Sequence, residues 1–332
     1  MSRPLDFPEL LQAFFSHRLI ALRQASPHTI ASYRDTFRLL LQFAHKTLGK
    51  PASKITLENL NATFIGAFLD SLEHDRSNGV RTRNLRMAVI RSFFRYAALE
   101  NPQHSGLIQR VLAIPSKRHE RRLVGFLARA EIDALLTVPN RDSWRGRRDH
   151  ALLLLAVQTG LRLSEITALR QQDVVLGRAA HVRCVGKGRK ERCTPIVKST
   201  AAVLAEWIRE QGPGSTQILF PNAQGGRLSS DAVQCLVYKY AAAAARTCPT
   251  LKAKRVTPHV LRHSAAMELL QAGVDRSVIA LWLGHESVET TQIYLDADLA
   301  LKEQALKKAN PLDATALRFR PDDQLLTFLK SL

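Results

Sequence analysis

The last third of the chain carries histidine, arginine and tyrosine residues whose order could support chemistry on a phosphate ester. The residues are His259-Val-Leu-Arg262-His263, then Gly284-His285, then Tyr294 nine residues later. A tyrosine phenol can act as a nucleophile that forms a covalent intermediate, and planar guanidinium groups bind phosphoryl oxygens bidentately. Together with Arg162, in the segment Thr-Gly-Leu-Arg-Leu-Ser-Glu, these residues form the set of cations around one phenol that attack on a phosphodiester needs.

Arg162 and Arg262 are the two candidates for a clamp on the phosphate. A phosphorus atom under attack carries extra negative charge on its nonbridging oxygens, and losing one donor to such a developing anion typically costs about 10²–10³ in rate. Thr257-Pro258 precedes His259 and predicts a helix that starts there. His259 and Arg262 would share one face near the helix start, which favours phosphate binding. A single His-x-x-Arg most often lies on an ordinary amphipathic helix, so the prediction depends on the whole set.

A zinc site is the main alternative for the histidines, because His259 and His263 have i,i+4 spacing and His285 could be a third ligand. The glutamate of an HExxH motif is missing between them, and Arg262 beside a divalent cation would be electrostatically unfavourable. We therefore predict no metal. The sequence also lacks the glycine-rich loop GxxxxGK[ST] that binds nucleotides, and we predict no cofactor.

Size and composition are those of a soluble globular protein with a polyanionic partner. The chain has 332 residues, with 45% hydrophobic residues, 23% charged residues and a net charge of +19, which favours two domains and a nucleic acid as ligand. Residues 1–115 carry 15 basic and 8 acidic side chains, and the remainder carry 33 and 21, so both parts could touch phosphates. The four cysteines show no CxxC spacing. Without an apolar span or a signal-peptide pattern, we expect a cytoplasmic protein.

The first 100 residues are predicted to form a four-helix module. Apolar residues recur at helical spacing in 7–24, Ser26-Pro27 caps a second helix that ends near Gly49, and further helices span about 57–72 and 82–99. The last of these helices and the charged segment 114–123 are rich in cations, which lie either on a solvated surface or against DNA phosphates. The candidate DNA contacts are Arg81, Arg83, Arg86, Arg91 and Arg95 in the helix and Lys117, Arg118, Arg121 and Arg122 in the segment.

The second part of the chain is predicted to be mainly helical with a small antiparallel sheet. Strands are expected at 180–185 and 192–197, joined by a polar tip that carries Lys187, Arg189 and Lys190. The expected helices span about 128–138, 147–158, 163–171, 199–211, 229–245, 259–272, 275–283 and 297–309.

These motifs together resemble the tyrosine recombinases of the phage integrase family, closest in layout to Xer-type and transposon-borne enzymes. The matching segments are Thr-Gly-Leu-Arg162-Leu-Ser-Glu165, Gly-Lys187-Gly-Arg-Lys-Glu-Arg, His259-Val-Leu-Arg262-His263, Leu-Gly-His285 and Tyr294. The resemblance covers roughly residues 1–310. It implies a site-specific recombinase that cuts and rejoins DNA through a 3′-phosphotyrosyl intermediate, for integration, excision or resolution.

The resemblance also implies a role for each matched residue. Tyr294 would be the nucleophile, and Arg162, Arg262 and His285 would hold the scissile phosphate. His259 would assist proton transfer from the tyrosine. Lys187 would protonate the leaving 5′-oxygen, with Lys190 as the alternative, and Arg189 and Lys190 are further candidate DNA contacts. Glu165 would orient Arg162.

The implied architecture has a SAM-like helical core-binding domain at 1–113, a basic linker at 114–123, a catalytic domain at 124–310 and a tail at 311–332. The tail ends in an amphipathic pattern whose Leu325, Leu326, Phe328 and Leu329 would pack between subunits or on their own domain. In the family, four protomers assemble on two duplexes with inverted half-sites, in some cases with other recombinases or accessory proteins. The long tail favours a mobile-element enzyme, and the lack of a domain before residue 6 disfavours a two-site phage integrase.

Two other functions use the same features. A type IB topoisomerase would relax supercoils with the same chemistry, but the N-terminal helical module favours recombination. A noncatalytic DNA-binding protein would not need every catalytic position to be filled.

Overall fold

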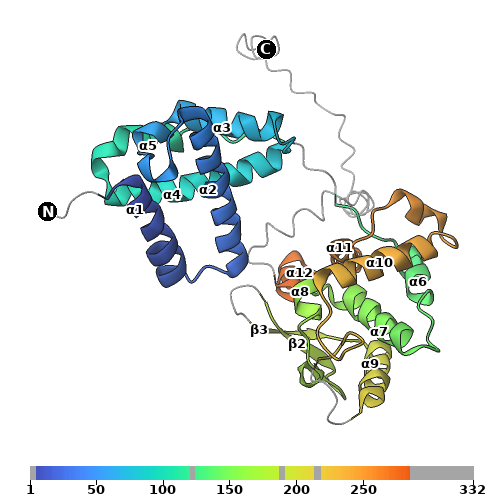
Figure 1. Cartoon of the computed structure of the whole chain (residues 1–332). Coiled ribbons are helices and arrows are strands. Elements are labelled where there is room, and N and C mark those ends of the chain that lie inside the picture. The colour runs from blue at the N-terminus through green and yellow to red at the C-terminus, as the bar shows by residue number, and fades with distance from the viewer. Residues whose placement is uncertain (1–4, 120–123, 187–190, 213–217, 285–332) are drawn as a thin grey trace, which may run out of the picture. The chain divides into compact units, whose positions relative to one another are not determined.

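The computed structural model describes residues 5–119, 124–186, 191–212 and 218–284 (Figure 1). The chain forms two compact units, Met1–Arg121 and Arg122–Leu332, and each is described separately. Several predicted features lie outside the described residues. They are the cations Arg121, Arg122, Lys187, Arg189 and Lys190, the site residues His285 and Tyr294, the helix at 297–309 and the tail at 311–332.

The first unit is entirely helical in its described part. Its helices are α1 (Phe7–Ala13), the π-helix η1 (Phe14–Leu22), α2 (Pro27–Leu48), α3 (Ala62–His74), α4 (Val80–Glu100) and α5 (Ser105–Leu112), with short 3₁₀ turns η2 (Ala52–Lys54), η3 (Glu58–Leu60) and η4 (Pro102–His104). The predicted N-cap at Ser26 is confirmed, because its hydroxyl accepts a hydrogen bond from the N–H of Thr29 at 3.2 Å. Helix α5 was not predicted, because its eight residues are too few for a clear periodic pattern.

The predicted helix at 7–24 is instead two helices of different pitch. After α1 the backbone continues as a nine-residue π-helix, in which hydrogen bonds skip one residue more than in an α-helix. Phe14 and Leu19 are both almost fully buried, at 1% exposure each, and they lie five residues apart. The wider turn therefore places both side chains in the core of this unit, where Phe14 packs edge-on against Phe93 of α4 with ring centroids 5.5 Å apart.

The second unit combines helices with a three-stranded sheet. Its helices are α6 (Arg129–Thr137), α7 (Trp144–Thr159), α8 (Leu163–Ile166), α9 (Lys198–Gln211), α10 (Ser230–Ala244), α11 (Pro258–Gln271) and α12 (Arg276–Leu283), with 3₁₀ turns η5 (Gln171–Asp173) and η7 (Pro249–Ala253). The strands β1 (Val174–Val175), β2 (His181–Val185) and β3 (Glu191–Pro195) pair antiparallel in that order. The fold-class prediction, mainly helical with a small antiparallel sheet, is confirmed. The predicted helix at 163–171 is wrong in length, since α8 is a single turn.

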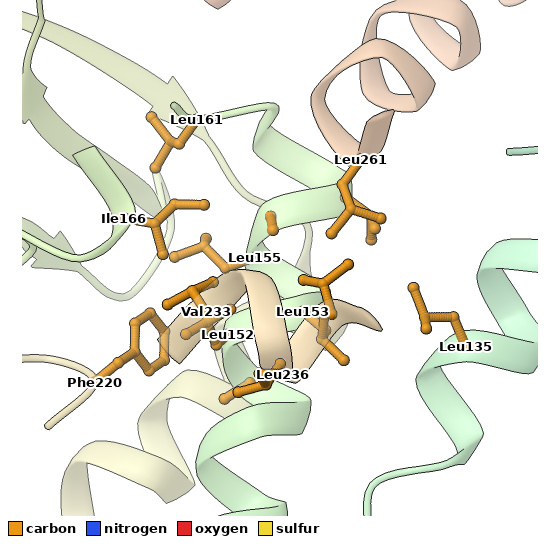
Figure 2. Close-up of a cluster of buried hydrophobic side chains, with 14 of the residues drawn as sticks. Leu135, Leu152, Leu153, Leu155, Leu161, Ile166, Phe220, Val233, Leu236 and Leu261 are labelled. Carbon is orange, nitrogen blue, oxygen red and sulfur yellow. The ribbon is translucent and has the colours of Figure 1, made fainter. Parts of the chain in front are cut away.

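Helix α7 lies at the centre of the second unit's core. Leu152, Leu153 and Leu155 of this helix are buried among side chains from α6, α10 and α11, as Figure 2 shows. Helices α11 and α12 share a smaller cluster around Met267, Ile279 and Leu283. Because α7 is packed within this core, its two ends are fixed, and its C-terminal end leads directly to Arg162. No helix in the described ranges is both long and apolar enough to cross a membrane.

Candidate active site

Arg162 lies in the short turn between α7 and α8. Helix α7 ends at Gly160, which has a left-handed backbone with φ 62°; a Cβ there would come within 2.6 Å of Leu283, so this position requires glycine. Arg162 is the N-cap of α8, and its N–H donates to Glu165 Oε2 at 2.7 Å. Its Nη1 also donates to Glu165 Oε1 at 3.0 Å. The sequence motif therefore folds so that the carboxylate holds both ends of the arginine.

Helix α11 supplies the second arginine and His259. The predicted start is confirmed: Thr257 is the N-cap, and its hydroxyl accepts from the N–H of Val260 at 3.3 Å. His259 is exposed in the first turn and packs edge-on against the buried His263, with ring centroids 4.2 Å apart. Arg262 is only 4% exposed, and its Nη1 donates to the carbonyl of Gly160 at 2.6 Å.

The C-terminal end of α12 gathers three guanidinium groups. Arg192 donates to the carbonyl of Trp282 at 3.2 Å, Arg262 to that of Leu283 at 2.8 Å, and Arg162 to that of Gly284 at 2.7 Å. Carbonyls in the last turn of a helix lack intrahelical partners and lie at its negative end. Three consecutive carbonyls thus hold three cations together. Arg162 and Arg262, which are separated by 100 positions in the chain, bind neighbouring carbonyls directly before His285.

Glu165 is the acidic centre of this cluster. Its side chain is 3% exposed, and Arg192 donates to its two oxygens from Nη1 at 3.0 Å and Nη2 at 2.7 Å. Burial alone would raise the pKa of Glu165, but the hydrogen bonds from Arg192 and Arg162 hold it below the ordinary value. Burial would likewise lower the pKa of Arg192, and the contact with Glu165 keeps it above the ordinary value. The Glu165 carboxylate and the Arg192 guanidinium therefore stay charged near neutral pH.

Sequence reasoning missed Arg192. The residue is the last of the segment Gly-Lys-Gly-Arg-Lys-Glu-Arg, whose pattern assigns it no role. Its signal is strand alternation, since Arg192, Thr194 and Ile196 lie two residues apart and the latter two are buried. A cation on the inward face of a strand needs an acidic partner. The partner, Glu165, comes from a distant part of the chain, so the sequence alone could not identify it.

The candidate DNA contacts on α4 separate into different environments. Arg81 and Arg95 are exposed and keep the predicted solvent-facing position. Arg83 is a correction: it is 5% exposed and forms an ion pair with Glu73 of α3 at 3.4 Å, because the helical turn points it into the unit. Arg86 donates to Thr36 of α2 at 2.8 Å.

The remaining candidate DNA contacts, in and near the linker, also include both cations that are bonded to other residues and one that is exposed. Arg91 donates to Ser116 at 3.2 Å. Lys117 pairs with Glu73 at 2.5 Å, and its backbone exchanges hydrogen bonds with Asn84 at 2.7 and 3.0 Å. The start of the linker therefore packs on α4. Arg118 is exposed.

Comparisons with known proteins show which family the chain belongs to. The phage integrase family matches residues 125–300, and its N-terminal SAM-like domain matches residues 11–101. The chain belongs to the phage integrase family. Membership makes it a tyrosine-type site-specific DNA recombinase, and these matches give no support to the topoisomerase alternative.

Two curated relatives illustrate the similarity. The chain is 60% identical to the integrase/recombinase y4rC of Sinorhizobium fredii, over the full length of both. It is 36% identical to the tyrosine recombinase XerC of Roseiflexus castenholzii, over 86% of this chain and 88% of that protein.

Solved structures show the same fold at low sequence identity. The recombinase XerH bound to a palindromic difH substrate, in a post-cleavage complex, has a TM-score of 0.69 at 22% identity, over 86% of this chain and 81% of that one. A lambda integrase tetramer bound to a Holliday junction has a TM-score of 0.61 at 16% identity, over 88% and 78% of the two chains. The SAM-like and catalytic parts of the fold prediction are thereby confirmed.

Proposed function

We propose that the chain breaks and rejoins DNA at this site with Tyr294 as the nucleophile. The phenol oxygen would form a bond to phosphorus while the bond from phosphorus to the 5′-oxygen breaks, which leaves a 3′-phosphotyrosyl link and a 5′-hydroxyl. The phenol proton would pass toward His259, and the 5′-oxygen would take a proton from Lys187, with Lys190 as the alternative donor. Rejoining reverses these steps, so the phosphotyrosyl bond replaces any nucleotide energy source.

One observation carries this proposal: Arg162 and Arg262 donate to the neighbouring carbonyls of Gly284 and Leu283, at 2.7 and 2.8 Å. Two guanidiniums held this close can bind two nonbridging oxygens of one phosphate. His285, the next residue along the chain, would add a further donor. Preorganised donors of this kind cost no reorganisation when charge develops at phosphorus.

We further propose double-stranded DNA with inverted half-sites as the partner and a tetramer as the active assembly. A lambda integrase with this fold is a tetramer on a Holliday junction, and XerH is bound to a palindromic substrate. The domain boundaries at 1–113, 114–123 and 124–310 belong to this proposal. We also propose that the protein acts in the cytoplasm and is carried by a mobile element. Further recombinases or accessory proteins are proposed as partners. The outcome would be integration, excision or resolution.

The deciding experiment captures covalent DNA. The full chain is incubated with double-stranded fragments from the DNA beside its gene, with EDTA present, and detergent-resistant adducts are recovered and sequenced. We expect adducts in which the freed strand carries a 5′-hydroxyl that a polynucleotide kinase can label. Tyr294→Phe should bind the same fragments without forming adducts. Tyr238→Phe is the control, because Tyr238 is 71% exposed on α10, and it should behave as the unaltered chain.

Three results would contradict parts of this proposal. Adducts that persist in Tyr294→Phe would exclude the assigned nucleophile, and a dependence on a divalent metal would exclude the metal-free mechanism. Relaxation of supercoiled plasmids that lack the recovered site would restore the topoisomerase alternative.

The tail at 311–332 is proposed to contact a neighbouring subunit through Leu325, Leu326, Phe328 and Leu329. A truncation before Pro311 should still bind the recovered fragment as single protomers but lose synapsis of two duplexes, as measured by native electrophoresis. Intact synapsis by the truncated chain would place the tail on its own domain.

A further inference from the structure

We propose that Arg192 is a positioning residue for the recombination reaction, which holds Glu165 and the end of α12 so that Arg162 faces the scissile phosphate. The inference rests on the proposed function and adds a residue to it. Arg192 differs from Arg162 in how its guanidinium is used. All three of its nitrogens bind protein, with Nε on the carbonyl of Trp282 and Nη1 and Nη2 on the two oxygens of Glu165.

The Arg192 side chain is less exposed than that of Arg162. The Arg162 side chain is 30% exposed, which leaves room for a phosphate against it. The Arg192 side chain is 12% exposed and is enclosed by its partners. Because the Arg192 guanidinium donates to Trp282 and Glu165 from every nitrogen, we assign its effect on the reaction to the residues that it holds in place.

The path runs through the Glu165 carboxylate, which accepts four hydrogen bonds from two arginines. Oε1 accepts from Nη1 of Arg162 and Nη1 of Arg192, both at 3.0 Å; Oε2 accepts from the Arg162 backbone N–H and Nη2 of Arg192, both at 2.7 Å. These bonds fix the plane of the carboxylate. Without Arg192, the carboxylate could turn and bind the Arg162 guanidinium bidentately, the pairing that arginine and carboxylate prefer. Donors of Arg162 would then be withdrawn from the phosphate.

A second path runs through the residue before His285. Gly284 has a left-handed backbone with φ 65°, and a Cβ at this position would lie 2.6 Å from Nη1 of Arg192. The guanidinium therefore packs directly on the Gly284 backbone while its Nε binds the carbonyl two residues earlier. Arg192 is also the partner of Cys184 in the β2–β3 ladder, one pair from the loop end of the two strands, so it ties that end of the strand pair to the cluster around Arg162.

The test uses Arg192→Met, which approximates the aliphatic part of the side chain and removes the guanidinium with its charge. Arg147→Met is the matched control, because Arg147 also forms a bidentate pair with a glutamate, Glu210, at 2.7 and 2.6 Å, and its other hydrogen bonds go to the carbonyls of Arg141 and Asp142, outside the site. The substrate is the fragment recovered as an adduct with the unaltered chain. We expect Arg192→Met to form adduct about 10- to 100-fold more slowly at saturating DNA, as for a misplaced catalytic group, with DNA affinity unchanged within about threefold. Arg147→Met should keep the full rate.

A second substrate distinguishes positioning from a general structural defect. It carries a methylphosphonate at the scissile position, which replaces one charged nonbridging oxygen by a methyl group and so weakens the need for Arg162. We expect the rate penalty of Arg192→Met to shrink at least several-fold on this substrate, as it should for Arg162→Ala. Arg192→Lys, which can bind Glu165 through one nitrogen only, should show an intermediate penalty. If Arg192→Met does not fold, Arg192→Lys on the two substrates decides.

The outcomes separate this inference from the proposed function. An equal penalty on both substrates, or an unchanged rate in Arg192→Met, would overturn the positioning role while the unaltered chain still forms adducts. Absence of adduct with the unaltered chain would overturn the proposed function, and the role of Arg192 with it.

Discussion

At the scale of residues, the site contains three arginines that differ in their hydrogen-bond partners and in their exposure. Arg262 is buried and holds the ends of α7 and α12 together, through the carbonyls of Gly160 and Leu283. Arg162 is the most exposed of the three, and Arg192 holds the carboxylate between them. One buried negative charge thus balances part of the charge of the cluster. The remaining positive charge is what a phosphate would neutralise.

Gly284 provides a test of this arrangement. Gly284→Ala places a methyl group against Arg192 at a left-handed backbone position, which should cost about 1–2 kcal/mol for the backbone and displace the guanidinium as well. We expect lower stability of the second unit and adduct formation slowed about tenfold or more. Stability is measured by urea unfolding with tryptophan fluorescence, because all three tryptophans, Trp144, Trp207 and Trp282, lie in this unit.

Gly273→Ala is the control for Gly284→Ala. Gly273 also has a left-handed backbone, φ 82°, but a Cβ there meets no atom within 4 Å. It should lose similar backbone stability and keep the rate of adduct formation. Equal rates in the two variants would show that contact between Gly284 and Arg192 does not matter to the reaction.

Site residues could be predicted from the sequence when the proposed reaction requires a particular residue type at that position. The pairing of Arg162 with Glu165 could be expected because the two lie three residues apart at a helix start. Arg192 could not, because its partner is 27 positions away and strand alternation says only that it points inward. Where Lys187, His285 and Tyr294 lie relative to the arginines stays a prediction.

At the scale of elements, helix ends place the site, and their caps are testable. Thr257→Ala removes the hydroxyl that accepts from the N–H of Val260, which should cost about 1 kcal/mol of stability. The loosened first turn carries His259, so we also expect slower adduct formation. Stability is measured by urea unfolding and the rate by adduct yield over time.

Ser229→Ala is the matched control for Thr257→Ala, because Ser229 caps α10 in the same way, with a 3.0 Å bond from the N–H of Ala232. It should lose similar stability and keep its rate. A slowed reaction in both variants would trace the effect to stability rather than to His259.

Helices α7 and α10 are joined by a buried hydrogen bond from the hydroxyl of Tyr240 to Asp149, at 2.8 Å. Burial raises the pKa of the Tyr240 phenol, and the Asp149 carboxylate raises it further. The folded state thus favours the protonated phenol, so its contribution is fully present below the ordinary pKa near 10.0 and is lost as the pH rises above that value. Tyr240→Phe should cost about 1–3 kcal/mol at pH 8.

The pH dependence gives the check on this bond. Between about pH 8 and about pH 10.5, the unaltered chain should lose more free energy of unfolding in urea than Tyr240→Phe does. Tyr238→Phe, at an exposed position, should follow the unaltered chain. A parallel decline in all three would mean that Tyr240 is not the titrating group.

Helix positions followed from periodicity more closely than helix pitch or length did. Helix α11 starts at Pro258 because Thr257 and the proline make a local start signal. Helix α8 stops after four residues, although 163–171 has helical spacing, because the next segment turns into β1 and the sheet. The π-helix at Phe14–Leu22 depends on burial of Phe14 and Leu19 against other helices, which no local pattern encodes.

At the scale of the whole molecule, the excess of basic residues in both parts of the chain was predictable. Which of these basic side chains are exposed and which are buried was not. The basic excess in both parts of the chain follows from composition alone. On α4, however, a step of two residues turns the side chain by about 200°, so exposed Arg81 and buried Arg83 lie on different faces. Only packing against Glu73 of α3 decides which of them faces outward.

This difference leads to a prediction for the salt dependence of DNA binding. Each phosphate contact releases about one counterion, so losing one contact should lower the slope of log affinity against log salt by about 1. We expect this change for Arg81→Ala and for Arg95→Ala on a nonspecific duplex, measured by fluorescence anisotropy over about 50–200 mM salt. Arg83→Met removes the same charge from a buried ion pair, so it should lower stability and leave the slope unchanged. If all three variants change the slope equally, then total charge, rather than the exposed face of α4, governs DNA binding.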